Sequence, residues 1–150
     1  MVGTTRRAMF GAIGSIAAAS LISQAIAAAN PADTGLLKAW NERQTALAKI
    51  EKRGSFYLSE YHSAELTEEF DAAEMKVVNI EAATPRGLLC KLWVALAHSG
   101  GPVSGPEGRA QFDAIRRADY AEVTSFACEL NFDSQCIWRV IQSLALMVEG

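Results

Sequence analysis

The apolar residues of this chain recur at every third or fourth position, and this spacing constrains its fold more than any other feature. The clearest row is Leu66, Phe70, Ala73, Val77 and Ile80, with steps of four, three, four and three residues. Such steps gather side chains on one face of an α-helix, whereas a half-buried strand needs strict alternation of apolar and polar residues. No such alternation recurs along the sequence, which therefore predicts an all-α fold.

Capping residues and chain breakers divide the sequence into further helices. Thr84-Pro85 has the form of a helix start, and Asp119 with Glu122 forms a capping pair. The glycines and prolines of residues 99–108 exclude regular structure there. The predicted helices span about 34–53, 63–83, 84–96, 107–118 and 119–130, and a last helix follows. The first has an apolar row that admits Arg43, and Asp33 or Thr34 is its predicted cap. The last is capped by Asp133 or Ser134 and carries Ile137, Ile141, Leu144 and Val148 on one face, beside Trp138.

The first two of these helices carry opposite net charge. Residues 33–53 hold five basic and three acidic side chains, whereas residues 63–83 hold one basic and six acidic side chains. Opposite charge favours packing of one helix on the other, although exposed pairs contribute only about 0–1 kcal/mol each and set orientation more than stability. We expect an antiparallel helical hairpin connected through residues 55–59, against which three or so further short helices pack.

The N-terminal segment has the three parts of an export signal. Arg6 and Arg7 form a short cationic start, and an uncharged, mildly apolar run follows from residue 8 to residue 29. Ala27 and Ala29 then place small side chains before Asn30, where a signal peptidase requires them; cleavage before residue 28 is the alternative. The sequence predicts a helical signal peptide over residues 1–29 and a single helical domain over residues 30–150, located in the periplasm or secreted.

The route of export and the fate of this segment stay open. Thr5-Arg6-Arg7 matches the start of the twin-arginine pattern, but Met9, Phe10 and Gly11 stand where Phe, Leu and Lys are usual. General secretion is therefore also compatible with the sequence. Two further interpretations are an N-terminal alanine-rich helix of a cytoplasmic protein and an uncleaved membrane anchor.

Net charge excludes one class of partner. Without Arg6 and Arg7 the chain has 12 basic and 17 acidic side chains, which is a net charge of −5. Nucleic-acid binding depends on positive charge, so we expect no nucleic-acid partner. The expected partners are the export machinery and a protein, either a different one or a second copy of this chain. A membrane is a partner only if the N-terminal segment is uncleaved.

The three cysteines, Cys90, Cys128 and Cys136, allow one disulfide with one thiol left over. Cys128 and Cys136 are the candidate pair, because a break near residues 131–134 can fold their helices back on each other. The alternative is three buried thiols that act as small apolar side chains.

No catalytic, phosphate-binding or haem motif occurs in the sequence, so we assign no catalytic residue and expect no cofactor. Whether the protein is an enzyme stays open, although no feature of the sequence favours an enzymatic function. The one candidate metal cluster comprises Glu60, His62 and Glu65, which His98 can join in space. Its spacing matches no metal signature, and the alternative is a group of surface residues with His98 at a helix end.

In overall plan the chain resembles short uncharacterised bacterial proteins that combine a twin-arginine-type signal with a small helical domain. The resemblance is carried by the signal, by the acidic helix that ends in EAATPRGLLCKLWVAL, and by Lys91 four residues after Gly87. Such proteins have no associated reaction or substrate, so the resemblance implies bacterial export only.

Our functional hypothesis is therefore an exported helical protein that acts by contact with another protein or with itself. The alternatives are a periplasmic metal-binding protein or enzyme with a site near His62 and His98, and a cytoplasmic protein with an uncleaved N-terminal helix.

Overall fold

The computed structural model describes residues 31–52, 64–99 and 106–149, which form six α-helices and no strand. The all-α prediction is confirmed for this part of the chain. The elements are η2 (Pro31–Asp33), α2 (Thr34–Glu51), α3 (Ala64–Asn79), α4 (Pro85–Ser99), α5 (Pro106–Arg117), α6 (Tyr120–Phe126), η3 (Ala127–Glu129) and α7 (Phe132–Glu149).

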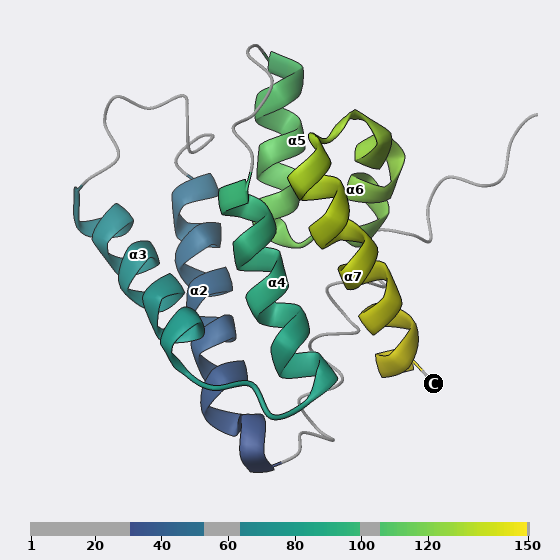
Figure 1. The fold of residues 1–150 in the computed structure, drawn as a ribbon. Coiled ribbons are helices and arrows are strands. Elements are labelled where there is room, and N and C mark those ends of the chain that lie inside the picture. Colours follow the sequence, from purple (N-terminus) through teal and green to yellow (C-terminus); the bar gives the residue numbers. More distant parts are fainter. Residues whose placement is uncertain (1–30, 53–63, 100–105, 150) are drawn as a thin grey trace, which may run out of the picture.

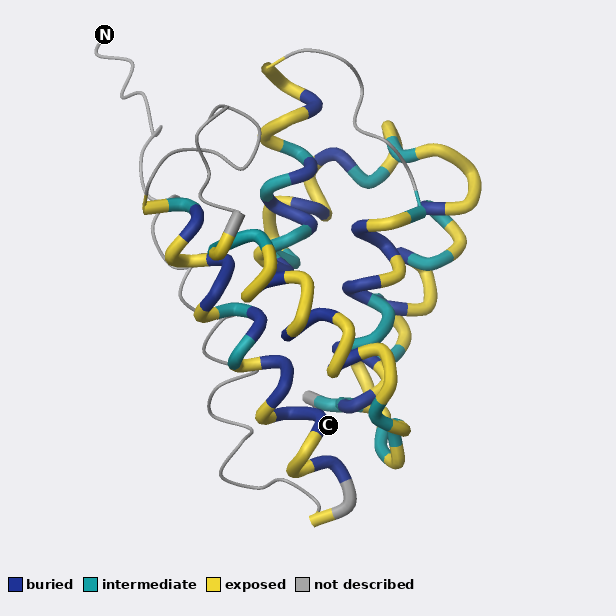
Figure 2. Tube along the Cα trace, turned by 90° about the vertical axis from the view of Figure 1, so that its left-hand side faces the viewer, coloured by how far each residue is buried: buried dark blue, intermediate teal, exposed yellow. Residues whose placement is uncertain are grey.

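Four of the helices lie side by side across the molecule. Figure 1 shows them in the order α3, α2, α4 and α7, with α5 and α6 gathered toward one end. Helix α4 is central, since it contacts α2, α3, α5 and α7. Figure 2 shows that the buried residues of each helix face its neighbours while exposed residues face outward. This is the arrangement that the three-and-four spacing of apolar residues requires.

Helices α2 and α3 form the expected antiparallel hairpin. Lys49 Nζ lies 2.5 Å from Glu69 Oε1, and Lys76 Nζ lies 2.9 Å from Glu42 Oε2. The contact thus moves seven residues back along α2 and seven residues forward along α3, which only antiparallel helices can satisfy. The opposite charges predicted from the sequence do meet across this interface.

The core is one large apolar cluster that contains Trp40, Trp93 and Trp138, with a smaller cluster of Ala46, Leu47, Ile50 and Phe70 inside the hairpin. The sequence places apolar residues of the helix at 84–96 on one face, namely Leu88, Leu89, Leu92, Trp93 and Leu96. The buried faces of this helix and of α7 are rotated from those predicted. On α4, Leu89, Trp93 and Leu96 are buried, whereas Leu88 is exposed and Leu92 only partly buried. On α7, Trp138 and Ile141 are fully buried, whereas Ile137, Leu144 and Val148 are only partly buried. The indole of Trp138 is the larger apolar group, so it takes the centre of the face.

Two helix starts agree with the predicted caps, whereas those of α2 and α7 do not. Thr84 Oγ1 accepts a hydrogen bond from Gly87 N at 3.2 Å, and Asp119 Oδ1 accepts one from Glu122 N at 3.0 Å. At α7 the cap is Asn131, whose Oδ1 accepts from Ser134 N at 2.9 Å, so the prediction of Asp133 or Ser134 was wrong. Asparagine is as effective a cap as aspartate or serine.

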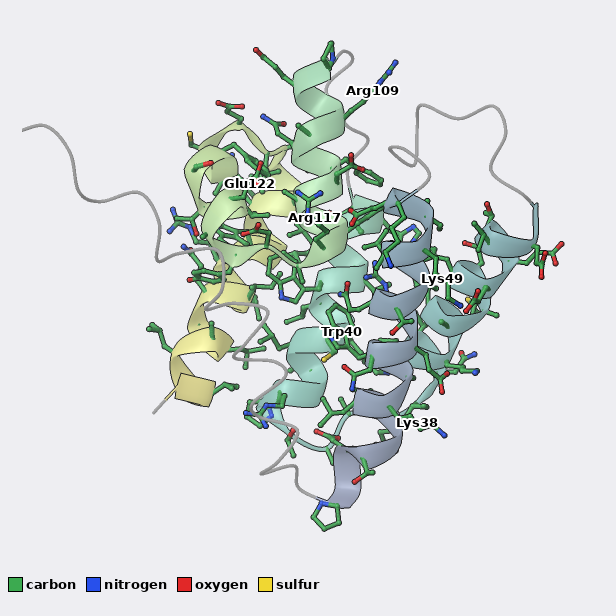
Figure 3. All side chains as sticks on the ribbon, turned by 180° about the vertical axis from the view of Figure 1, so that it is seen from behind. Lys38, Trp40, Lys49, Arg109, Arg117 and Glu122 are labelled. Atoms are coloured by element: carbon green, nitrogen blue, oxygen red, sulfur yellow. The ribbon has the colours of Figure 1, made fainter. Side chains whose placement is uncertain are left out.

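Helix α5 ends in a left-handed residue and an ion-pair network. Ala118 has a φ of 57°, and Asp119 N donates to Ala114 O at 3.0 Å, which closes the helix end. Arg117 Nη1 lies 3.2 Å from Glu51 Oε1, and Arg117 Nη2 lies 3.8 Å from Glu122 Oε2. Figure 3 shows Arg117 and Glu122 close together, with Trp40 in the interior between α2 and α4. Arg117 therefore links α2, α5 and α6.

Several predictions concern residues that the structure does not describe. The export signal with Arg6 and Arg7 and the cleavage region with Ala27, Ala29 and Asn30 lie outside the described residues, as does the connection at 55–59. Within the described helices, none is both long and apolar enough to cross a membrane.

Candidate functional site

A buried ion pair joins α2 to α3 near the middle of the hairpin. Arg43 Nε donates to Glu74 Oε2 at 2.8 Å, and Arg43 Nη2 lies 2.8 Å from the same oxygen. The side chains of Arg43 and Glu74 are 1% and 10% exposed. Removing a charge from water costs several kcal/mol, and this cost is offset only when the charges are paired and hydrogen-bonded. Each of the two residues therefore depends on the other at this position.

Backbone and aromatic groups complete the surroundings of Arg43. Its Nη1 donates to Arg116 O at 2.9 Å, which ties α2 to α5. Its Cζ lies 5.2 Å from the ring centroid of Trp40 and 4.9 Å from that of Phe70, while Arg116 Cζ lies 4.5 Å from the centroid of Phe112. At these distances the aromatic faces attract the guanidinium groups. Charge in this part of the core is thus stabilised by rings as well as by a carboxylate.

The pKa values of the pair follow from burial and from their mutual charge. Burial alone raises the pKa of Glu74, but the positive charge of Arg43 and hydrogen bonds from His98 and Arg43 outweigh it and hold that pKa below its ordinary 4.5. Burial lowers the pKa of Arg43 despite the opposing effect of Glu74. An arginine side chain nevertheless stays protonated in proteins, so both groups are charged at neutral pH.

His98 extends the pair to α4. Its Nε2 lies 2.5 Å from Glu74 Oε1, and its side chain is 63% exposed. An ionised carboxylate can only accept, so Nε2 carries the proton in this contact. A carboxylate that holds one ring nitrogen in this way leaves Nδ1 of the neutral ring as the acceptor, which is how histidines are oriented for proton transfer or for metal binding. The Arg43–Glu74–His98 cluster is the candidate site with the clearest chemistry.

Of the candidate metal cluster, the structure describes only Glu65 and His98, and it does not bring these two together. His98 contacts Glu74, whereas Glu65 is exposed in the first turn of α3, nine residues before Glu74 and hence about 13 Å away along the helix. Glu60 and His62 lie outside the described residues. Nowhere in residues 31–52, 64–99 or 106–149 do three or more His, Cys, Asp or Glu side chains gather as a metal site.

Asp33 forms a second buried polar site, where the starts of α2 and α4 meet. It was predicted to cap α2, but its side chain makes no capping hydrogen bond there. Instead its Oδ1 accepts from Ala83 N at 2.8 Å and its Oδ2 accepts from the Thr84 hydroxyl. These hydrogen bonds, together with one from the backbone of Gly87, outweigh the effect of burial and lower the pKa of Asp33. The carboxylate therefore stabilises the start of a distant helix instead of its own.

Gly87 is required by this arrangement. A Cβ at this position would lie 2.5 Å from Asp33 Oδ2 and 2.8 Å from Asp33 Cγ, which is closer than such atoms can approach. The side chain that would collide is 1% exposed and fixed by its hydrogen bonds. The glycine thus makes room for the carboxylate.

All three cysteines are free thiols in the structure, with Cys90 buried and Cys128 and Cys136 exposed. Burial raises the pKa of Cys90 to about 12, so its thiol is protonated and unreactive. Cys128 lies on η3 and Cys136 in the first turns of α7. The predicted bridge between them stays a prediction for the oxidised protein. The alternative of three buried thiols is wrong for Cys128 and Cys136, because both side chains reach solvent.

Sequence reasoning found part of this site and missed the rest. Arg43 was recognisable because a charged residue stood in an otherwise apolar row. Glu74 and Asp33 were missed, since their partners are 31 and 50 residues away along the chain. A signal for Glu74 was its position between Ala73 and Val77 on the buried face of α3, one step from the apolar row.

Comparison with known proteins adds no relative. No protein-family model, no curated protein and no solved structure matches this chain. Its function must therefore be argued from its own residues.

Proposed function

We propose that this chain is a small exported helical protein that acts by contact with another protein or with a second copy of itself. The observation that carries the proposal is the amount of large apolar side chain that the folded domain leaves exposed. Phe132, Leu146 and Met147, all on α7, are 79%, 71% and 67% exposed. A contiguous exposed apolar surface is typical of a binding surface, whereas single exposed apolar residues are common everywhere.

Export is supported by the N-terminal sequence. Arg6 and Arg7, the mildly apolar run that follows them, and the small residues Ala27 and Ala29 before Asn30 have the order of a cleavable signal. The periplasm or the cell exterior is the corresponding location, and the twin-arginine system is the corresponding route.

Intact-mass measurement and fractionation test the export claim. The protein recovered outside the cytoplasm should begin at Asn30, or at Ala28, and a product that retains Met1 would contradict cleavage. Replacing both Arg6 and Arg7 with lysine should block the twin-arginine route, which requires the paired guanidinium groups, while general secretion requires only positive charge. A full-length, cytoplasmic product would favour the alternative of an uncleaved N-terminal helix.

Affinity capture tests the claim of protein contact. Tagged protein expressed in its own compartment should recover a stoichiometric partner or untagged copies of itself after mild cross-linking. Recovery of neither, across extracts from several growth conditions, would contradict the proposal. A tagged variant in which only the exposed Phe132, Leu146 and Met147 are replaced by serine is the control for nonspecific capture.

A periplasmic metal-binding protein or enzyme is the second candidate, and the Glu74–His98 contact is the observation that favours it. A carboxylate-held imidazole with an exposed ring can accept a proton or contribute one metal ligand. Elemental analysis of protein from its native compartment decides this candidate. Stoichiometric zinc, copper or iron that is lost in His98→Ala, and retained in a surface variant such as Lys38→Ala, would favour it over protein contact.

A further inference from the structure

Two cleavage positions in the N-terminal segment meet the sequence requirement of a signal peptidase equally well. Cleavage before Asn30 has Ala27 and Ala29 at the third and first positions ahead of the cut. Cleavage before Ala28 has Ala25 and Ala27 at the same two positions. Because both pairs are alanine, the residues ahead of the cut do not choose between the two positions. The choice has to come from another part of the molecule.

The folded domain begins directly after these positions. Helix η2 starts at Pro31, and its last residue, Asp33, is 1% exposed. Asp33 is the fourth residue of a chain that begins at Asn30 and the sixth residue of a chain that begins at Ala28. An extended chain spans at most about 3.6 Å per residue, so the two cleavage positions differ by about 7 Å in their greatest possible distance from the folded domain.

Contacts with the start of α4 hold Asp33 in place. Its Oδ1 accepts a hydrogen bond from Ala83 N at 2.8 Å, and its Oδ2 accepts one from the Thr84 hydroxyl. Gly87 packs closely against the carboxylate, since a Cβ there would lie 2.5 Å from Asp33 Oδ2. Figure 1 shows the starts of α2 and α4 at the same end of the molecule. We call the packing of Asp33 against Ala83, Thr84 and Gly87 the Asp33–α4 contact.

The Asp33–α4 contact affects the two cleavage positions differently. A protease binds its substrate as extended chain on both sides of the bond that it cuts, so structured chain is cleaved mainly from a locally open state. Cleavage before Asn30 therefore requires Pro31–Asp33 to leave η2 and the Asp33–α4 contact to break. Cleavage before Ala28 leaves two more residues between the cut and η2, so the contact stays intact.

We infer that the Asp33–α4 contact selects the cleavage position: the folded precursor is cut before Ala28, and cutting before Asn30 requires the start of the domain to open. Water is added across the peptide bond in this step, which leaves a carboxyl group on Ala27 and an amino group on Ala28. The inference rests on the proposed function, since it specifies how the proposed signal is removed. The twin-arginine system carries folded proteins, so a product of that route should begin at Ala28.

Two glycine substitutions provide a matched test that leaves residues 25–33 unchanged. Gly87→Ala displaces the Asp33 carboxylate, whereas a Cβ at Gly35 meets nothing within 4 Å. The folded, full-length precursors are incubated with purified bacterial signal peptidase in detergent, and intact mass identifies the first residue of each product. Wild type and Gly35→Ala should yield chains that begin at Ala28. Gly87→Ala should raise the share of chains that begin at Asn30 by at least about fivefold, because it raises the population of the open state.

Thr84→Val provides a second variant, which decides the question if Gly87→Ala does not fold. It removes the hydroxyl that donates to Asp33, and it should change the products in the same direction. Because it also removes the cap of α4, its control is Asp119→Ala, which removes the cap of α6. This control should leave the products as in wild type. Circular dichroism checks that each precursor is folded.

The outcomes separate this inference from the proposed function. Folded wild type that is cut mainly before Asn30 would overturn the role of the Asp33–α4 contact while leaving the signal in place. The same products from the wild type, Gly87→Ala and Thr84→Val would have the same consequence. A precursor that is cut at neither position and retains Met1 would overturn the proposed signal, and this inference with it.

Discussion

The α2–α3 hairpin and the α4–α7 pair are held together by different kinds of side chain. In the hairpin, the buried Arg43–Glu74 pair lies between the helices, flanked by exposed pairs such as Lys49–Glu69. Between α4 and α7 the rings of Trp93 and Trp138 meet edge to face, with centroids 5.8 Å apart and an interplanar angle of 63°. The hairpin adds a buried ion pair to its apolar contacts, whereas the α4–α7 interface depends on the shape of large apolar groups.

The difference shows how each interface fixes the relative position of its two helices. A buried charge accepts only one partner without large cost, so Arg43–Glu74 fixes the register of α2 against α3. Aromatic packing is less directional and tolerates small shifts, so α4 and α7 are further fixed at one end by Ser99 Oγ and Ser134 Oγ, 2.9 Å apart. The exposed surfaces differ in the same way as the interfaces: the exposed side chains of α3 are mainly acidic, and those of α7 are mainly apolar. We associate the hairpin with the fold and α7 with contact.

The largest expected effect is in the aromatic interface. Trp138→Ala removes a side chain that is 2% exposed and contacts both Trp93 and Tyr120, whose centroids lie 5.8 Å and 5.0 Å from that of Trp138. Loss of a buried tryptophan should lower the free energy of unfolding by about 3–5 kcal/mol. Urea denaturation followed by circular dichroism measures the change. A loss below about 1 kcal/mol would show that α7 is not part of the cooperative core.

Breaking the ionic interface should cost nearly as much. Glu74→Ala leaves the charge of Arg43 buried without its carboxylate, and we expect a loss of about 3 kcal/mol or more in the same assay. Glu69→Ala on the same helix removes only an exposed pair with Lys49 and should cost less than about 1 kcal/mol. Equal losses from the two substitutions would mean that burial of the Arg43–Glu74 pair does not matter. Replacing Arg43 and Glu74 together with apolar residues should recover much of the loss.

Substitution of glycine by alanine should change the stability less, and in opposite directions at two positions. Gly87→Ala would force a Cβ to within 2.5 Å of Asp33 Oδ2, and we expect it to destabilise by about 1–3 kcal/mol. Gly35→Ala, within α2, meets nothing within 4 Å and should stabilise by about 0.5–1 kcal/mol through the higher helix propensity of alanine. Thermal melts of both variants should therefore move in opposite directions. A stabilising Gly87→Ala would rule out the close packing of Asp33.

Acidification should give the smallest and most gradual effect. The pKa values of Asp33 and Glu74 are lowered in the folded state, from ordinary values of 3.8 and 4.5. Their stabilising contribution is therefore complete above the unfolded pKa values and is lost as the pH falls through the folded ones. Urea midpoints should stay level from neutral pH to about pH 5 and then decline. Glu74→Gln should show a shallower decline, and an identical pH profile would contradict the role of Glu74.

The fold was predictable from the sequence wherever the signal was local. Apolar spacing identified α2, α3, α4, α5 and α7, and the Asp119–Glu122 capping pair identified α6. The opposite charges of the first two helices predicted their pairing. Thr84 and Asp119 were correctly identified as caps, because each contacts a backbone group three residues away. These features depend on contacts within one or two helical turns, which a sequence displays directly.

The site was less predictable because its contacts are long-range. Asp33 has the sequence position of a cap for α2, and only the fold shows that Ala83 and Thr84 lie close enough to compete for its carboxylate. The sequence linked His98 to Glu60, His62 and Glu65. Its partner in the structure, Glu74, is 24 residues away on a different helix. The exposed apolar residues of α7 were not predicted, because the predicted buried face was centred on Ile137 and Leu144. Placing the larger Trp138 at the centre of the inner face turns Val140 and Met147 outward.

A dilution series followed by residue-resolved amide NMR tests self-association through α7, the central claim for this helix, most directly. Amide shifts of the processed protein would be recorded from about 20 μM to about 1 mM, a range that covers weak self-association. Our account predicts concentration-dependent shifts confined to residues 132–147, with those of α3 unchanged. Shifts that are constant throughout this range, or that occur on α3 and not on α7, would contradict it.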